Sequence, residues 1–144
     1  MVESIPKIGC EKNPARYESR IPGSLQARQA CLLHVISAAE TVYMSVFCSG
    51  ELYAGFRRLN EGTGENKDIL RQFLKAKPGI KILNATLETA EVFGYVKFCL
   101  KKAGTPLPIN DVWIAAHALE SGAVVITYDA RFMTVPGLRL WEIK

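Results

Sequence analysis

The chain has 144 residues, which is the length of a single domain. Its apolar fraction of 49% is ordinary for a soluble globular protein, and no apolar run reaches the roughly 20 residues needed to span a bilayer. The residues before Glu18 lack the basic-then-apolar order of a signal peptide, so we expect a cytoplasmic protein with no membrane partner. The net charge of +4 is compatible with a polyanionic partner such as RNA but does not require one.

The cysteines indicate neither a zinc site nor a redox pair. There are four, they are widely separated, and none belongs to a Cys-x-x-Cys pair. We expect free thiols at all four positions: Cys10, Cys31, Cys48 and Cys99.

The first part of the chain divides into an irregular segment and the start of a folded domain. Residues 1–22 hold three prolines and no periodic apolar pattern, so we predict an irregular segment there and a domain over 23–144. Apolar residues at helical spacing then follow Ser24 as far as Ala39. The run Thr41–Phe47 is rich in β-branched and aromatic residues and predicts a strand, after which a helix starts near Ser49.

The second part of the chain alternates strands with helices. The first predicted elements are a helix over 66–76, a strand over 80–83 and a helix over 86–103 that Gly104 ends. A helix capped by Asn110 or Asp111 then runs to Leu119 and leads to a strand over 123–127. The last predicted elements are one turn over 130–133, a bend at 135–137 and a strand over 138–143. Such alternation is typical of a parallel sheet covered on both faces. We therefore predict an α/β fold with three layers and a central parallel sheet flanked by helices.

Three carboxylates stand where a parallel α/β fold builds its binding sites. Glu51 follows the first predicted strand, Asp111 opens a helix, and Asp129 comes two residues after the strand that ends at Thr127. Ligands of open parallel sheets bind beyond the carboxyl ends of the strands. Carboxylate oxygens suit Mg²⁺ or Mn²⁺, and such an ion can activate water and neutralise charge on a phosphodiester.

Each of these residues also has a structural interpretation. Asp111 could be only a helix N-cap, worth about 1 kcal/mol. Asp129 could be a turn former. Glu51 could only favour the positive end of its helix.

The stretch from Pro106 to Phe132 (PLPINDVWIAAHALESGAVVITYDARF) resembles the C-terminal half of PIN-domain ribonucleases. Within that family it is most similar to the VapC-type toxins of toxin–antitoxin pairs. The segments Ser49–Leu52 and Val135–Leu138 fit the same family. The resemblance implies a PIN-like fold and a Mg²⁺- or Mn²⁺-dependent endoribonuclease, inhibited by a cognate antitoxin protein and often a homodimer.

The resemblance also implies roles for individual residues. Glu51, Asp111 and Asp129 fall on the acidic positions of the family, as catalytic residues and metal ligands. Thr127 falls on a position that often carries a hydroxyl near the metal, and Asn110 neighbours the site.

The N-terminus departs from the family pattern. The family begins with an apolar strand that ends in an Asp, a principal metal ligand, whereas no Asp occurs between Met1 and Val46. Glu18 stands at a suitable distance before Glu51, but Arg16 and Arg20 beside it favour a solvated charge cluster. An alternative function is therefore a catalytically impaired PIN-fold protein that binds an antitoxin or a sister chain.

Two further groups of residues have open interpretations. His117 lies six positions after Asp111, which turns it away from the face of that carboxylate, so we favour packing over a metal or acid–base role. Five basic residues could contact RNA phosphates or could be solvated surface charge: Arg57, Arg58, Lys101, Lys102 and Arg131.

Overall fold

The computed structural model describes residues 16–19, 39–59 and 80–143. They form five strands, three α-helices and one 3₁₀-helix. In chain order these are β1 (Arg16–Ser19), β2 (Val42–Ser45), α2 (Val46–Leu59), β3 (Ile80–Leu83), α4 (Leu87–Ala103), α5 (Ile109–Ser121), β4 (Val124–Thr127), η1 (Ala130–Thr134) and β5 (Arg139–Ile143). None of the helices in these stretches is long and apolar enough to cross a membrane.

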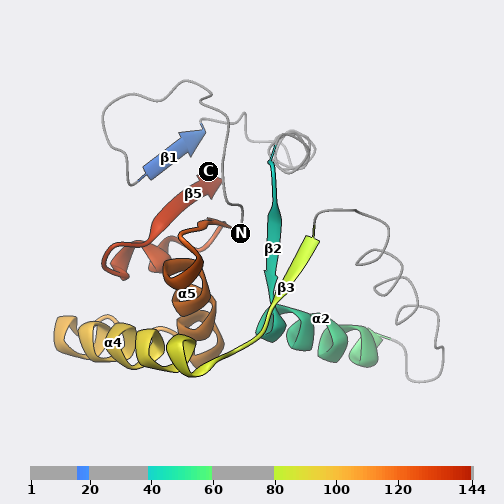
Figure 1. The fold of residues 1–144 in the computed structure, drawn as a ribbon, viewed down its shortest axis with the longest axis horizontal. Helices are drawn as coiled ribbons and strands as arrows, with labels where there is room; N and C mark the ends of the chain where they lie inside the picture. The colour runs from blue at the N-terminus through green and yellow to red at the C-terminus, as the bar shows by residue number, and fades with distance from the viewer. Residues whose placement is uncertain (1–15, 20–38, 60–79, 144) are drawn as a thin grey trace.

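All the strand pairs are parallel, as predicted, and they fall into two groups. One group has the order β1-β5-β4, and the other is the pair β2-β3. Figure 1 shows the β2–β3 pair to one side of α5 and the β1–β5 pair to the other. Within the part of the chain that the structure describes, no strand links β2 to β4.

The N-terminal segment differs from its prediction. Residues 1–22 were predicted to be irregular, but Arg16–Ser19 form a strand that pairs with β5, with Glu18 opposite Glu142. The predicted helices over 24–39 and 66–76 lie mostly or wholly outside the described residues. The boundary between an N-terminal segment and a domain over 23–144 stays a prediction.

The junction of β2 and α2 corrects a second prediction. The strand predicted over Thr41–Phe47 ends at Ser45, and α2 begins at Val46. The hydroxyl of Ser45 accepts a hydrogen bond from the backbone N–H of Phe47 at 3.2 Å, which satisfies a free donor of the first helical turn. The early start moves Glu51 beyond the first turn of α2, so its carboxylate is not placed at the positive end of the helix.

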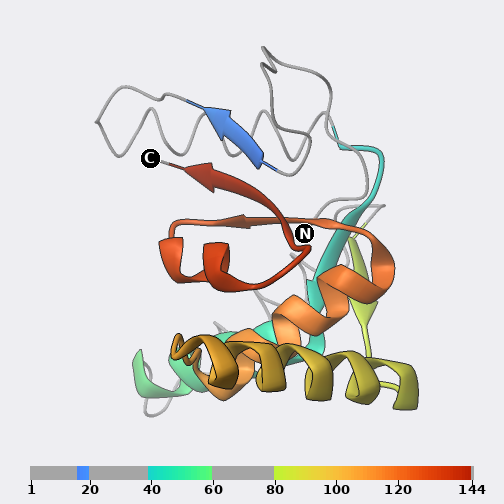
Figure 2. The same cartoon turned by 90° about the vertical axis from the view of Figure 1, so that its left-hand side faces the viewer.

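Helix α4 has the bounds that its apolar spacing predicted. Thr86 is the N-cap and forms a capping box with Thr89, and Gly104 ends the helix in the left-handed conformation at φ 70°. Thr89 is fully buried, and its hydroxyl donates to the carboxylate of Glu120 on α5 at 2.6 Å. This contact joins the start of α4 to the end of α5, and Figure 2 shows the two helices packed together below β4.

The start of α5 corrects a third prediction. Asn110 or Asp111 was expected to cap this helix, but the N-cap is Pro108, and no side chain makes a capping hydrogen bond. Both polar residues lie in the first turn instead. Their side chains make contacts outside the helix, with residues from other elements.

The core lies between α4, α5 and the β4–β5 pair. Val96 and Ala115 are completely buried, and so is Ala116. An aromatic stack extends this core toward α2, because Trp113 lies 5.0 Å from Phe47 and 4.0 Å from Phe93 between ring centroids. The remaining core members are Leu100, Val112, Ala118, Val125, Phe132, Val135, Leu138 and Leu140.

Candidate functional site

The turn after β4 places Asp129 in a defined position. Thr127 is the last residue of β4, and its hydroxyl accepts a hydrogen bond from the backbone N–H of Asp129 at 3.0 Å. Asp129 is then the N-cap of η1, and its Oδ1 accepts from the backbone N–H of Arg131 at 2.9 Å. Two local hydrogen bonds therefore hold this carboxylate at the carboxyl end of the strand, where parallel sheets bind ligands.

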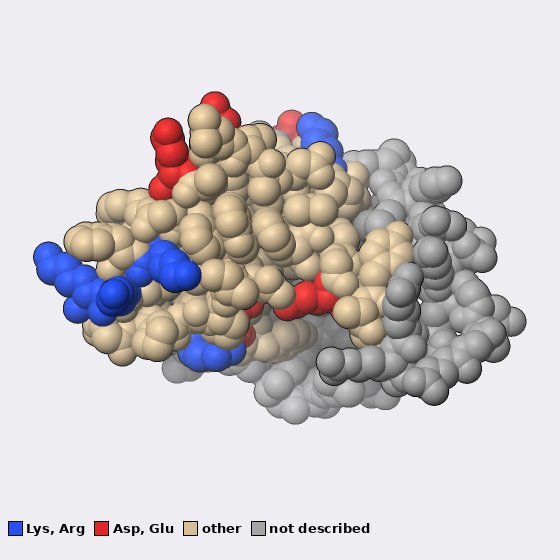
Figure 3. All heavy atoms as spheres, turned by 90° about the horizontal axis from the view of Figure 1, so that it is seen from below, with Lys and Arg blue, Asp and Glu red and all other residues tan. Residues whose placement is uncertain are grey.

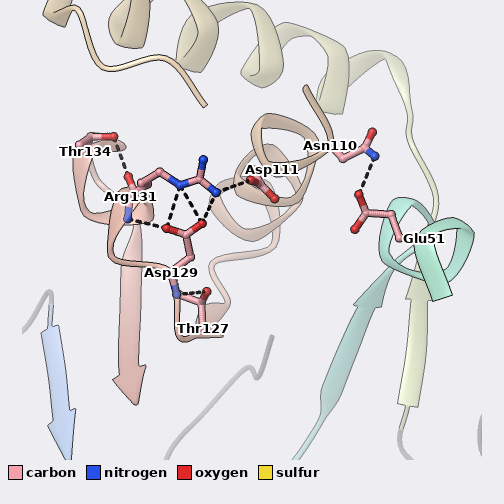
Figure 4. Close-up of polar contacts among 7 residues, drawn as sticks. All are labelled: Glu51, Asn110, Asp111, Thr127, Asp129, Arg131 and Thr134. Carbon is pink, nitrogen blue, oxygen red and sulfur yellow. Dashed lines mark hydrogen bonds and ion pairs between the residues drawn. The ribbon is translucent and has the colours of Figure 1, made fainter. Parts of the chain in front are cut away.

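Arg131 joins Asp129 to Asp111. Its Nε lies 3.0 Å and 2.9 Å from the two carboxylate oxygens of Asp129, and its Nη2 donates to Asp129 Oδ2. The same Nη2 lies 3.9 Å from Oδ2 of Asp111, which extends from the first turn of α5. Figure 4 shows the guanidinium between the two acids. The fold thus places the carboxylates of Asp111 and Asp129 around one positively charged side chain, that of Arg131.

The surroundings of the two acids shift their pKa values in opposite directions. Burial raises the pKa of Asp111, the nearby Arg131 lowers it in part, and the charges of Asp129 and Glu51 raise it further. Hydrogen bonds from the side chain and backbone of Arg131 lower the pKa of Asp129. Asp111 is therefore close enough to Asp129 and to Glu51 to be repelled by both carboxylates, which is a cost that a bound cation relieves.

Glu51 belongs to a separate pair on the other side of the start of α5. Its Oε1 accepts a hydrogen bond of 2.7 Å from Nδ2 of Asn110 (Figure 4). Among the described residues, no three acidic, histidine or cysteine side chains are gathered closely enough to hold a metal ion. The structure therefore brings Asp111 and Asp129 together at Arg131 and leaves Glu51 in a separate pair with Asn110.

The donor set fits a hard divalent cation. Asp111 and Asp129 offer carboxylate oxygens, and the place between them already holds a positive group, the Arg131 guanidinium. Mg²⁺ needs only one or two protein carboxylates when water and substrate phosphate fill its other positions. Asp111 and Asp129 are the residues that would hold such an ion, with Glu51 adjacent.

Two other candidate residues lie elsewhere. His117 is 2% exposed, and its Nδ1 lies 3.0 Å from the Ser45 hydroxyl in the interior, in keeping with a packing role. Glu18 lies on β1, which β5 separates from the β4 strand that leads to Asp129. Its side chain lies outside the description of the structure, as do the side chains of Arg57 and Arg58.

Basic residues gather at the end of α4. Lys97, Lys101 and Lys102 are exposed, and Figure 3 shows basic side chains at this end of the molecule. Arg131 was not singled out from the other basic residues by sequence. The local signal was present, because an Asp at a turn with an Arg two residues later can form both backbone and side-chain contacts.

A family model with the description PIN domain matches residues 26–138. The chain belongs to the PIN-domain family. The resemblance found in the stretch Pro106–Phe132 is therefore confirmed, and with it the prediction of a PIN-like α/β fold.

Two curated proteins called Ribonuclease VapC1, from Haemophilus influenzae strains R2866 and 86-028NP, are each 46% identical to this chain over 44 residues. The match covers 30% of this chain and only 32% of each relative.

Solved structures of two toxin–antitoxin complexes share the fold over most of the chain. VapBC-1 from nontypeable Haemophilus influenzae gives a TM-score of 0.71 at 23% identity, covering 82% of this chain and 88% of that one. VapBC2 from Rickettsia felis, bound to a DNA fragment from its promoter, gives a TM-score of 0.68 at 23% identity, covering 80% and 84%. At this identity the likeness establishes the PIN fold.

Proposed function

We propose that this chain is a metal-dependent endoribonuclease that acts as the toxin of a type II toxin–antitoxin pair. The observation that carries the proposal is the convergence of Asp111 and Asp129 on a single positive group at the carboxyl end of β4. Membership of the PIN-domain family and the similarity to VapC ribonucleases support it. The catalytic and metal-binding residues would be Glu51, Asp111 and Asp129, with Mg²⁺ or Mn²⁺ as the ion.

The chain's own residues prepare this site in distinct ways. When bound, the ion supplies a Lewis acid that activates water and neutralises charge on the phosphodiester. Thr127 fixes the turn that presents Asp129, and Asn110 fixes the carboxylate of Glu51. Arg131 stabilises the ionised form of Asp129, because its hydrogen bonds lower the pKa of that carboxyl.

The proposal extends to partners and location. The substrate would be RNA, drawn to exposed cations such as Lys101 and Lys102. A cognate antitoxin protein would inhibit the enzyme, as expected from the VapBC complexes that share its fold, and the toxin could form a homodimer. Such a protein would act in the cytoplasm.

Cleavage of structured RNA with Mg²⁺ or Mn²⁺ tests the activity. We expect cleavage that needs the ion and that is lost in Asp111→Asn and in Asp129→Asn. Glu91→Gln on the exposed face of α4 is the matched control, because it neutralises one carboxylate far along the sequence from both acids, and it should cleave normally. Cleavage that survives both Asp substitutions would overturn the proposal.

One observation favours the alternative, a catalytically impaired PIN-fold protein that binds an antitoxin or a sister chain. No Asp occurs before Val46, and the described residues hold no complete acidic cluster. Calorimetric titration with Mn²⁺ separates the two functions. Binding that Asp111→Asn abolishes supports the nuclease, whereas no metal binding by a chain that still associates with a VapB-type antitoxin supports the interaction protein.

A further inference from the structure

Arg131 occupies the position between the two acids that a cation would need. Both oxygens of Asp129 accept hydrogen bonds from its side chain, at 3.0 Å and 2.9 Å from Nε. The ion pair of 3.9 Å to Asp111 adds the second carboxylate. No other Lys or Arg of the described residues forms an ion pair with either acid. This guanidinium is the counter-ion of the pair.

The side chain of Arg131 can also move away from the two acids. Its side chain is 59% exposed, whereas those of Asp111 and Asp129 are 21% and 31% exposed. The acids are therefore the fixed members of the group and the arginine is the solvated one. The bidentate geometry makes this pair stronger than most exposed ion pairs, but the guanidinium lies at the surface, where water can solvate it once it is released.

An arginine and a metal ion cannot use the same oxygens fully at the same time. While Arg131 holds both oxygens of Asp129, a metal that binds there must break at least one of these hydrogen bonds. When a binding-competent state is only partly populated, the apparent affinity falls by that fraction. The fraction of molecules in which Arg131 is paired with Asp129 therefore sets the apparent affinity of the site for metal.

Resting on the proposed metal site, we infer that Arg131 is a built-in competitor of the divalent cation. In the metal-free protein its guanidinium offsets part of the negative charge of Asp111 and Asp129 and preserves their arrangement. Metal binding displaces the guanidinium, and the freed side chain stays tethered beside the ion by η1. Arg131 is thus a positioning residue that tunes the metal requirement of the site.

The substitution Arg131→Gln isolates the guanidinium. The backbone N–H of residue 131 that donates to Asp129 Oδ1 is retained, so the cap of η1 persists. Titration of Mn²⁺ by calorimetry should show tighter binding to Arg131→Gln than to the natural chain, by about tenfold if the pair is open in one molecule in ten. Lys81→Gln removes one exposed positive charge from β3 and should leave the affinity unchanged.

A second measurement follows the arginine itself. In the metal-free protein, the Nε–H resonance of Arg131 should be shifted by its bond to a carboxylate, and saturation with Mg²⁺ should move it to the position of a solvated arginine. A resonance that stays in place while Mg²⁺ saturates the protein would overturn the inference, because the ion would then bind without displacing the side chain.

The outcomes separate this inference from the proposed function. Metal binding by the natural chain that depends on Asp111 but is not tightened in Arg131→Gln overturns the inference and leaves the nuclease site standing. Binding by Arg131→Gln alone supports the inference and shows that the arginine excludes the ion. No binding by either chain overturns both.

Discussion

Ser45 and His117 are hydrogen-bonded in the interior, with the serine hydroxyl 3.0 Å from Nδ1 of the imidazole. Ser45 is the last residue of β2 and His117 lies in the middle of α5, so this bond connects two elements that are far apart in sequence. Phe47 covers the ring at a centroid distance of 5.9 Å. The contact fastens the β2–β3 pair to the helix that carries Asn110 and Asp111.

The same histidine should make stability depend on pH. Burial lowers the pKa of His117, and the backbone of Asn84 and the carboxylate of Glu120 offset this only in part. By the usual limits of distance and angle, no described residue forms a hydrogen bond with Nε2 of this imidazole. The unfolded chain therefore takes up a proton first as the pH falls below about 6.5, and stability is lost in that direction.

Urea unfolding at about pH 7.5 and about pH 5.5, on either side of the ordinary histidine pKa, measures this effect. We expect the free energy of unfolding to fall as the pH is lowered in the natural chain, and to be nearly level in His117→Gln. The chain has two histidines, and substituting only His117 assigns any change in the slope to this side chain. An unchanged slope in His117→Gln would contradict the assignment.

The hydroxyl of Thr89 makes three hydrogen bonds at a fully buried position, one of them with the hydroxyl of Thr86 at 3.1 Å. It donates to Glu120 at 2.6 Å and accepts from the backbone N–H of Thr86 at 3.0 Å. Thr89→Val keeps the shape but leaves both partners without this group, which should cost about 1–3 kcal/mol of unfolding free energy. Thr89→Ser retains the hydroxyl and should lose less than Thr89→Val. Equal losses in the two variants would mean that packing, and not the hydrogen bonds, sets the cost.

Replacing either of two glycines by alanine should change the stability of the protein, in opposite directions at the two positions. Gly122 ends α5 at φ +66°, and an added Cβ would lie 3.4 Å from Nη2 of Arg139. Gly122→Ala should therefore cost about 1–2 kcal/mol, the penalty for a left-handed alanine. Gly94 lies within α4 with nothing near its Cβ position, and Gly94→Ala should stabilise the protein by about 0.5–1 kcal/mol. Thermal unfolding of both variants measures the difference, and a shift of the same sign in both would refute it.

The sequence predicted those features that depend on local pattern. The helix over 87–103 follows from apolar spacing and its Thr and Gly ends, and β3 and β4 follow from short β-branched runs between turns. The start of α2 was missed because Thr41–Phe47 has strand propensity throughout, and only the hydroxyl of Ser45 marks the change.

The residues of the proposed site come from the sequence, whereas their pairing comes from the structure. Glu51, Asp111 and Asp129 were recognisable from their places after strands and at a helix start, and from the family resemblance. The bond of Asn110 to Glu51 links residues 59 positions apart, and the Arg131 contact with Asp111 depends on how η1 packs beside α5. No local pattern specifies either contact. The same contacts explain why Asn110 and Asp111 do not cap α5: both side chains are engaged with other elements.

Asn110 should influence metal binding through Glu51. Its Nδ2 donates to Glu51 Oε1 at 2.7 Å and limits the directions in which that carboxylate can lie. If Glu51 contributes to the proposed site, Asn110→Ala should weaken Mn²⁺ binding by roughly tenfold, the lower end of what the loss of such a supporting group costs. Asp111→Asn removes a proposed ligand and should weaken binding more.

A double-mutant cycle separates this effect from a simple change in helix stability. Because Asn110 acts through Glu51, adding Asn110→Ala to Glu51→Ala should cause no further loss of Mn²⁺ affinity. Calorimetric titration of the two single variants and the double variant measures the coupling. Losses that add independently would show that Asn110 does not act through Glu51. Full affinity in Asn110→Ala, with lower affinity in Glu51→Ala, would show that Glu51 reaches the ion without this support.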